Sequence, residues 1–225
     1  MNHRPAIAVV VLGVSAGSCA AQVVTDTFED LLDSQSVISR SIGPYTYTIS
    51  TATGAVFTSR TYGVSTPLAF GGGSLPDNTP LNPAEVSGVR FISTVTNNAS
   101  ADRFDTVSPI EFAFAEPIQG FGVTTLDLLE ETSAASFLEI QLFDADDNLV
   151  ATDRVTGSQG GSGIDVDLFA EASDQVVVRA VLTGEINRGF AYGLDDVVIF
   201  APDPIPSPVT WPVLGGVVLA MRRQR

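Results

Sequence analysis

Carboxylates dominate the side chains of this sequence that could catalyse a reaction or bind a metal. The chain has 26 Asp and Glu against 11 arginines and no lysine, and its formal net charge is −15. Every acid lies between Asp26 and Asp203, and the region 22–205 carries seven arginines against 26 acids, a net charge of −19. The one histidine, His3, and the one cysteine, Cys19, both precede this acidic region. Its chemistry must therefore be built from carboxylates, hydroxyls and arginines.

This composition excludes several common kinds of functional site from the acidic region. A serine or cysteine nucleophile needs an adjacent base, usually His or Lys, and the region contains neither. A zinc site built from His and thiolate lacks both ligand types, and a phosphate-binding loop of the Walker type lacks its lysine. A net charge of −19 repels the phosphates of nucleic acid, so we expect no nucleic-acid partner.

Pairs of carboxylates are the remaining route to catalysis. Glycoside hydrolysis needs two carboxyl groups that face each other across the bond to be cleaved. The adjacent acids at 130–131, 146–147 and 195–196 do not provide this, because neighbouring residues on a strand point to opposite faces. With 26 acids such pairs arise by chance, so we expect no catalytic residue and no enzyme activity.

Calcium binding suits this composition better, because hard cations prefer several oxygen ligands. The segment 144–148, Asp-Ala-Asp-Asp-Asn, is similar to part of an EF-hand loop. Leu149 stands where that loop needs glycine, however, and Val155 stands where its bidentate glutamate belongs. We therefore expect a solvated hairpin turn at 144–148.

Many of these acids lie in or next to predicted short strands. Polar and apolar residues alternate in short runs separated by turn residues, most clearly at 137–143, where Glu139 and Gln141 share one face. This pattern predicts one all-β domain at 22–200, a single antiparallel β-sandwich or jelly roll. We expect at most one short helix, at 27–32, and a mobile or loosely packed segment at 60–87. The predicted strands lie at 45–49, 89–95, 110–114, 137–143, 149–155, 164–168, 176–182 and 197–200.

Two segments near the ends of this domain resemble the first and last strands of carbohydrate-binding jelly rolls. They are Thr-Asp-Thr-Phe-Glu-Asp at 25–30 and Ala-Tyr-Gly-Leu-Asp-Asp-Val-Val-Ile at 191–199. In several of those families an acid from each strand binds a structural calcium. The resemblance implies Glu29 and Asp196 as the two ligands, with Asp195 beside them. The alternative is that they are surface acids at strand ends, and no other cofactor is expected.

A carbohydrate-binding function also needs an aromatic surface on which a sugar ring can stack. The acidic region has no Trp, and Tyr45 and Tyr47 share one face of a predicted strand. These two tyrosines could form a small sugar platform, and the alternative is ordinary cross-strand packing. We expect Phe112, Phe114 and Phe121 to pack in the core.

Residues 1–21 have the features of a secretory signal peptide. Arg4 supplies a positive charge, residues 6–14 are apolar, and small residues lead up to Ala20 and Ala21. We expect signal peptidase to cleave after one of these two alanines, because nine apolar residues are too few to anchor the chain in a bilayer. The alternative is a lipoprotein cysteine at Cys19, which lacks the large apolar residue expected three positions before it. In both cases the domain leaves the cytoplasm.

The region after the domain has three parts. Prolines alternate through 201–208, which favours an extended linker. Residues 209–221 are uncharged and could form a membrane helix of about 20 Å, which flanking residues would extend toward the roughly 30 Å hydrocarbon core. The basic tail at 222–225 would stay cytoplasmic and leave the acidic domain outside. The alternative is a final amphipathic helix packed on the domain.

This C-terminal region resembles the PEP-CTERM sorting signal of exported bacterial proteins. In that family an exosortase, a membrane protease-transpeptidase, removes the tail near the proline motif. Ser207 departs from the pattern, since the family name implies glutamate at this position. The residues that carry the resemblance are the motif Pro206, Ser207 and Pro208, the apolar segment 209–221, and the basic tail Arg222, Arg223 and Arg225.

The resemblance implies an exported protein that is first held at the membrane by its tail, and the missing catalytic residues make a non-enzymatic role the expectation. An exosortase-type protease would then sort it to the cell surface or the extracellular matrix. The alternative is a carbohydrate-binding module that acts on extracellular polysaccharide.

Overall fold

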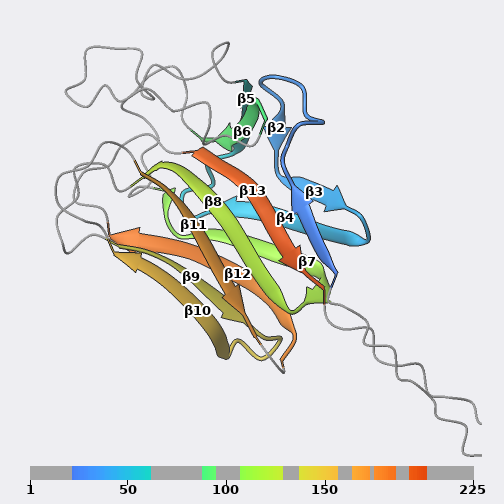
Figure 1. Cartoon of the computed structure of the whole chain (residues 1–225), viewed down its shortest axis with the longest axis vertical. Coiled ribbons are helices and arrows are strands. Elements are labelled where there is room, and N and C mark those ends of the chain that lie inside the picture. The colour runs from blue at the N-terminus through green and yellow to red at the C-terminus, as the bar shows by residue number, and fades with distance from the viewer. Residues whose placement is uncertain are drawn as a thin grey trace, which may run out of the picture. The chain divides into compact units, whose positions relative to one another are not determined.

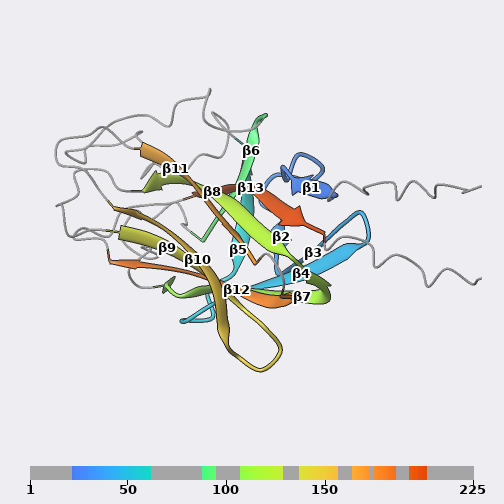
Figure 2. The same cartoon turned by 60° about the horizontal axis from the view of Figure 1, so that its bottom comes forward.

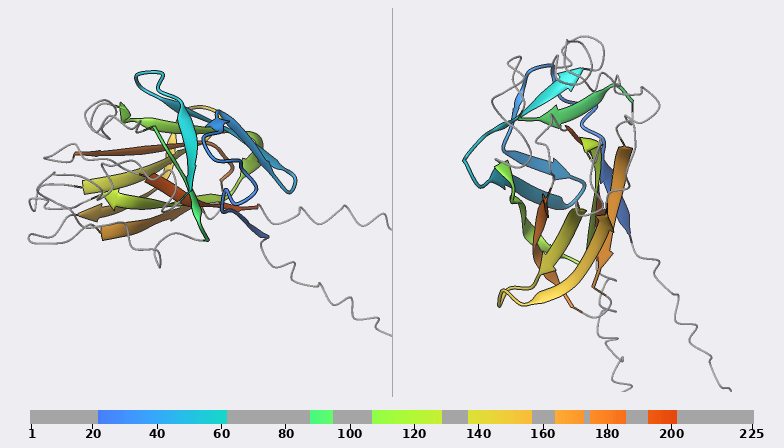
Figure 3. Two further views of the ribbon diagram at one scale, coloured as in Figure 1. Left: turned by 90° about the horizontal axis from the view of Figure 1, so that it is seen from above. Right: turned by 90° about the vertical axis from the view of Figure 1, so that its left-hand side faces the viewer.

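Two antiparallel β-sheets pack face to face in this protein (Figures 1 and 3). The structure is a computed structural model that describes residues 22–61, 88–94, 107–128, 137–156, 164–172, 175–185 and 193–201. The prediction of a single all-β antiparallel sandwich is confirmed. The signal peptide at 1–21, most of the 60–87 segment and the three parts of the tail from 202 onward lie outside the described residues, and remain predictions. Within the described ranges, no helix is long and apolar enough to cross a membrane.

Seven strands of the described chain form the first sheet, which we call sheet A. Their order is β11-β8-β13-β6-β5-β2, and β1 also pairs with β13. The first and last strands of the domain are therefore neighbours (Figure 2), in register from Val23 opposite Phe200 to Asp26 opposite Val197. The strands of sheet A are β1 (Val23–Asp26), β2 (Ser36–Val37), β5 (Phe57–Thr61), β6 (Arg90–Ser93), β8 (Gly120–Leu128), β11 (Ile164–Glu171) and β13 (Gly193–Phe200).

Six strands form the second described sheet, sheet B, in the order β10-β9-β12-β7-β4-β3. All eight runs predicted from the sequence overlap an observed strand in one of the two sheets. The short strands β2, β3 and β5 and the nine-residue strand β8 are not among the predicted runs. The strands of sheet B are β3 (Ser39–Ile42), β4 (Tyr45–Thr51), β7 (Ile110–Ile118), β9 (Phe137–Phe143), β10 (Leu149–Thr156) and β12 (Val177–Glu185).

Strand β9 shows how the alternating pattern builds the core. Leu138, Ile140 and Leu142 are fully buried between the sheets. Glu139 and Gln141 lie on the outer face of sheet B and are half-buried. Alternate side chains of a strand point to opposite faces, so this sequence can satisfy both environments only as a strand.

Aromatic rings fill the space between the sheets. Phe112 and Phe114 of β7 lie 4.7 and 5.4 Å, centre to centre, from the ring of Phe121 in β8. Because β7 belongs to sheet B and β8 to sheet A, these contacts join the two layers. The prediction that these three phenylalanines pack in the core is confirmed.

Residues 27–32 form turns, and the prediction of a short helix there is wrong. The Oδ1 atom of Asp26 accepts a hydrogen bond of 3.1 Å from the backbone N–H of Phe28. Phe28 has a φ of 58°, outside the helical region, and its side chain is fully buried. The side-chain hydrogen bond and the burial of this ring together hold the backbone in a turn instead of a helix.

Candidate functional site

A buried carboxylate joins the two sheets beside the first strand. Asp26, the last residue of β1 in sheet A, is only 3% exposed. Its Oδ2 accepts hydrogen bonds from the hydroxyl of Tyr47 at 2.7 Å and from Nε of Arg40 at 2.8 Å. Its Oδ1 accepts a further bond of 2.7 Å from Nη2 of Arg40. Because Arg40 lies on β3 and Tyr47 on β4, this carboxylate fastens sheet A to sheet B.

The same guanidinium also binds a second carboxylate. Nη2 of Arg40 donates to Oδ1 of Asp30 at 2.6 Å, and Nη1 donates to Oδ2 at 3.2 Å. The Arg40 guanidinium carbon lies 5.7 Å from the centre of the Phe28 ring, within the range of a cation–π contact. We call Asp26, Asp30, Arg40 and Tyr47 the Asp26 cluster. The Arg40 cation thus pairs with two of the acids near the start of the domain.

The pKa shifts of Asp30, Arg40 and Tyr47 follow from these contacts. The hydrogen bond from Arg40 lowers the pKa of Asp30 below its ordinary 3.8. The hydrogen bond to Asp26 is the main cause that raises the pKa of Arg40, so the guanidinium stays charged. Burial, reinforced by the Asp26 carboxylate, raises the pKa of Tyr47 well above its ordinary value, so the phenol remains a donor. The arrangement therefore suits a permanent structural link between the sheets.

Glu29, a predicted calcium ligand, binds backbone amides. Its Oε1 accepts hydrogen bonds of 2.7 Å from the N–H groups of both Val89 and Arg90, at the start of β6. Gly88 precedes them with a φ of +83°, and a Cβ on this glycine would lie 2.5 Å from Oε1 of Glu29. Glycine is thus required here both by the backbone conformation and by the space that Glu29 occupies.

Asp196, the other predicted calcium ligand, lies at a bulge in β13. The pairing of β13 with β8 shifts register between Asp195 and Val198, and Asp196 has a φ of 41°. Its backbone N–H donates to Oδ1 of the fully buried Asp195 at 2.9 Å. The structure thus places Asp196 on the strand that pairs with β1, and Glu29 three residues beyond the end of β1.

Calcium binding by Glu29 and Asp196 stays a prediction, but the structure restricts which atoms could be the ligands. Across the described residues, no three His, Cys, Asp or Glu side chains gather in a group that could hold a metal ion. The two N–H groups at Oε1 of Glu29 also disfavour a cation at that oxygen. A calcium ion between these acids would need the second oxygen of Glu29 and ligands from carbonyl groups or water.

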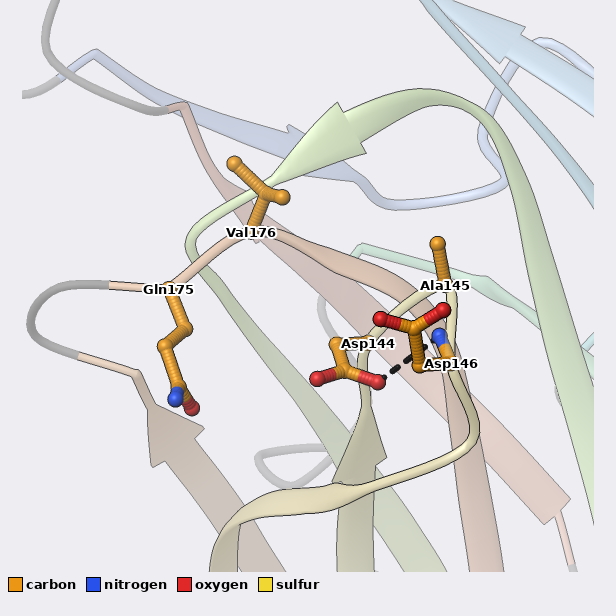
Figure 4. A pocket seen from close by; sticks show the side chains of 5 residues that line it. All are labelled: Asp144, Ala145, Asp146, Gln175 and Val176. Carbon is orange, nitrogen blue, oxygen red and sulfur yellow. Dashed lines mark hydrogen bonds between the residues drawn. The ribbon is translucent and has the colours of Figure 1, made fainter.

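The 144–148 segment forms the hairpin turn expected from the sequence, between β9 and β10. Oδ1 of Asp144 accepts hydrogen bonds of 2.9 Å from the backbone N–H groups of Asp146 and Asn148. The side-chain amide of Asn148 also donates to Asp144, and this hydrogen bond is the main cause that lowers the pKa of Asp144. Asp144 and Asp146 line an open pocket of about 320 Å³ with Gln175 and Val176 (Figure 4). The Asp144 carboxylate is thus engaged in holding its own turn.

Tyr45 and Tyr47 do not form a sugar platform, because their side chains point into the sandwich. Tyr45 is 9% exposed and Tyr47 is fully buried. The Tyr47 ring lies 6.2 Å from the ring of Phe112 and 6.5 Å from that of Phe114. The alternative interpretation, packing, is confirmed.

Two arginine–phenylalanine stacks on the outer face of sheet B are not predicted by the sequence. The guanidinium carbon of Arg154 lies 3.6 Å from the centre of the Phe137 ring, and that of Arg179 lies 4.1 Å from the Phe143 ring. Between the two rings, Glu139 forms a 3.5 Å ion pair with Arg154. These contacts depend on register, which sets Arg154 opposite Glu139 and Arg179 opposite Phe143.

Comparison with known proteins assigns the chain to no family. No protein-family model matches the chain, and no curated protein matches its sequence significantly. A DUF4465 family protein from Bacteroides caccae aligns over 80% of this chain and 100% of its own, at 9% identity and a TM-score of 0.44. The K2 cleaved adhesin domain of Lys-gingipain aligns over 79% and 97%, at 11% identity and a TM-score of 0.41.

A third similar structure is the xylanase 10B of Clostridium thermocellum with its CBM22-1 and GH10 modules. It aligns over 52% of this chain and 22% of its own, at 16% identity and a TM-score of 0.30. The two-sheet β-sandwich architecture follows from the strand topology of the chain itself.

Proposed function

We propose that this chain is an exported, non-enzymatic β-sandwich protein of the cell surface or extracellular matrix, delivered there by a PEP-CTERM-like tail. The observation that carries the proposal is that acids of the domain form structural hydrogen bonds. Asp26 is bound by Arg40 and Tyr47, and Glu29 is bound by two backbone amides. Carboxylates engaged in this way stabilise a scaffold, and those left at the surface keep it soluble and attract divalent cations.

The position of the two ends of the domain supports proteolytic cleavage on either side of it. The backbone N–H of Ala201 donates to the carbonyl oxygen of Gln22 at 2.8 Å. The first and last residues of the domain therefore lie side by side. Signal peptidase would cut next to Gln22, and an exosortase-type protease would cut near Pro206, Ser207 and Pro208. Neither cut removes any strand of the sandwich.

Mass spectrometry of the protein isolated from the envelope and medium of its own cells tests this proposal. We expect a mature form that begins at Ala21 or Gln22, ends near Pro206 to Pro208 and lacks the arginine tail. A membrane-bound form that retains Arg225 would mean that the tail is a plain anchor. A form that retains Met1 would contradict export through a cleaved signal peptide.

A carbohydrate-binding function is the second candidate, and the outer face of sheet B favours it. Phe137, Glu139, Gln141 and Phe143 share this face of β9, and all four are half-buried. Because Arg154 and Arg179 stack on the two rings, the row offers these guanidinium–ring pairs as a packing surface and Gln141 as a hydrogen-bonding group for a polysaccharide. Isothermal titration against a panel of glycans tests it. Saturable binding that Gln141→Ala abolishes and Ser50→Ala preserves would establish this function, whereas the absence of saturable binding would refute it.

A further inference from the structure

Three apolar residues form a continuous row on the outer face of sheet A. Phe169 of β11 and Phe200 of β13 have ring centres 4.4 Å apart. Val23 of β1 lies directly opposite Phe200 in the β1–β13 ladder. Phe169 is 39% exposed and Val23 is 52% exposed, although both are apolar. We call Val23, Phe169 and Phe200 the outer apolar row.

Two glycines of β8 allow this row to form. Strand β8 lies between β11 and β13, so a side chain on its outer face would separate the two rings. Gly122 lies opposite Phe169, and a Cβ there would be 3.1 Å from the Phe169 ring. Gly120 lies opposite Phe200, and a Cβ there would be 3.3 Å from Cβ of Phe200. The rings therefore meet above bare backbone.

The apolar character of this face is confined to one end of the sheet. Gly122 pairs with the half-buried Val198, which pairs with Thr25 of β1. Farther along β8, the hydroxyl of Thr124 donates to Oδ1 of the exposed Asp167 at 2.6 Å. Glu171, an exposed acid at the end of β11, borders the row on the other side. The exposed apolar surface is thus bounded by polar groups and lies at the end where Val23 and Phe200 are found.

This is also the end from which the chain continues toward the predicted membrane segment. Ala201 follows Phe200 and is bonded to Gln22, which precedes Val23. Seven residues, 202–208, connect Ala201 to the apolar segment that begins at Val209. An extended proline-rich segment spans about 3.1 Å per residue, so this connection reaches roughly 22 Å. A tail embedded in a bilayer would keep the outer apolar row close to the lipid surface.

We propose that the outer apolar row is a contact surface for the lipid bilayer, occupied while the tail holds the protein at the membrane. This proposal rests on the proposed function, because it requires residues 209–221 to be in the membrane. Aromatic and aliphatic side chains partition into the interfacial region of a bilayer, whereas the acidic remainder of the domain stays in water. The partner surface is zwitterionic lipid, because a domain of net charge −19 is repelled by anionic lipid.

Fluorescence quenching by brominated lipid tests the proposal. The acidic region has no Trp, so Phe169→Trp combined with Trp211→Phe leaves one indole, on the outer apolar row. The chain with its tail is reconstituted in phosphatidylcholine vesicles, with and without brominated acyl chains. We expect about a twofold loss of emission for this variant. The matched control is Thr152→Trp in the same background, since Thr152 is exposed on the outer face of sheet B, and its emission should not change.

The native Trp211 separates failure of this proposal from failure of the proposed function. In the unsubstituted chain, quenching of Trp211 shows that the tail is in the bilayer. If Trp211 is quenched and the Phe169→Trp indole is not, the row does not contact lipid and the proposal is overturned, while the proposed function stands. If Trp211 is not quenched, both are overturned.

A second position guards against a local effect of the substitution. Val23→Trp places the indole on β1, at the most exposed position of the row, where no buried packing is disturbed. We expect it to be quenched like Phe169→Trp. The outcome that would point to another occupant is a dimer in the absence of lipid, in which the indole of each variant is shielded from an aqueous quencher. A second copy of the chain would then cover the row, and the proposal would be overturned.

Discussion

The hydroxyl of Tyr47 donates a 2.7 Å hydrogen bond to Oδ2 of Asp26 across the two layers of the sandwich. The two residues are 21 positions apart and belong to different sheets. A similar link lies between the edge strands β10 and β11, where Oδ2 of Asp153 accepts a 2.9 Å hydrogen bond from the backbone N–H of Phe169. Carboxylates thus join the sheets both at β1 and at the β10–β11 edge.

Tyr47→Phe is expected to destabilise the domain by about 1–3 kcal/mol, because Asp26 then loses a buried donor. Tyr45→Phe is the matched control, since the Tyr45 hydroxyl makes no hydrogen bond within the described part of the chain, and the free energy of unfolding should hardly change. Urea denaturation of both variants measures the difference. Equal stabilities would show that the Tyr47–Asp26 bond contributes nothing.

Stability is expected to fall in acid, in part through Asp30. Its pKa is lowered in the folded state, so the unfolded state binds more protons at a pH near and below the ordinary value of 3.8. The stabilisation is therefore present above this pH and is lost as the pH falls through the lowered value. Asp30→Asn should reduce the difference in unfolding midpoint between about pH 5 and pH 3. An unchanged pH dependence in this variant would contradict the role of Arg40 at Asp30.

Gly88→Ala is expected to be more destabilising than Gly54→Ala. Both glycines have positive φ, +83° and +74°, so both substitutions strain the backbone by about 1 kcal/mol or more. At Gly54 no atom lies within 4 Å of an added Cβ, whereas at Gly88 the Glu29 carboxylate does. The difference between the two unfolding free energies isolates the loss of the Glu29 hydrogen bonds to Val89 and Arg90. Identical losses would mean that these hydrogen bonds do not stabilise the domain.

The calcium prediction for Glu29 and Asp196 is tested by thermal unfolding with added calcium and with a chelator. A bound ion stabilises only the folded state, so calcium should raise the Tm and the chelator should lower it. Glu29→Gln keeps an oxygen acceptor for the two backbone amides but removes the charge, and should abolish the calcium effect. The same Tm with and without calcium would show that no such site exists.

Sequence patterns predict most of the long strands because each of these carries its own alternation, whereas the nine-residue β8 is missed. In β9, buried leucine and isoleucine side chains alternate with Glu139 and Gln141, and this alternation is satisfied only by an extended chain. The short strands β2, β3 and β5 are rich in serine and threonine and carry no such pattern. Their extended conformation comes from pairing with β4, β5 and β6, which is a property of the assembled sheets.

The candidate site could be predicted only in part. Composition identifies carboxylates as the functional groups, and the two segments that resemble jelly-roll strands do pair, as β1 and β13. The partner of the early acids, Arg40, has no distinguishing spacing in the sequence. Its contact with Asp26 and Asp30 requires β1 and β3, in different sheets, to come together at one side of the sandwich.

The all-β character, the absence of histidine, cysteine and lysine chemistry from the acidic region, and the hairpin turn at Asp144 could be predicted, because they depend on composition and on residues near one another in the chain. The inward direction of Tyr45 and Tyr47, the binding of backbone amides by Glu29, and the contact of Phe169 with Phe200 above two glycines depend on how distant strands assemble. Alternation defines two faces of a strand, but which face is buried depends on the sheet that packs against it. Contacts between distant strands depend in the same way on strand order and register.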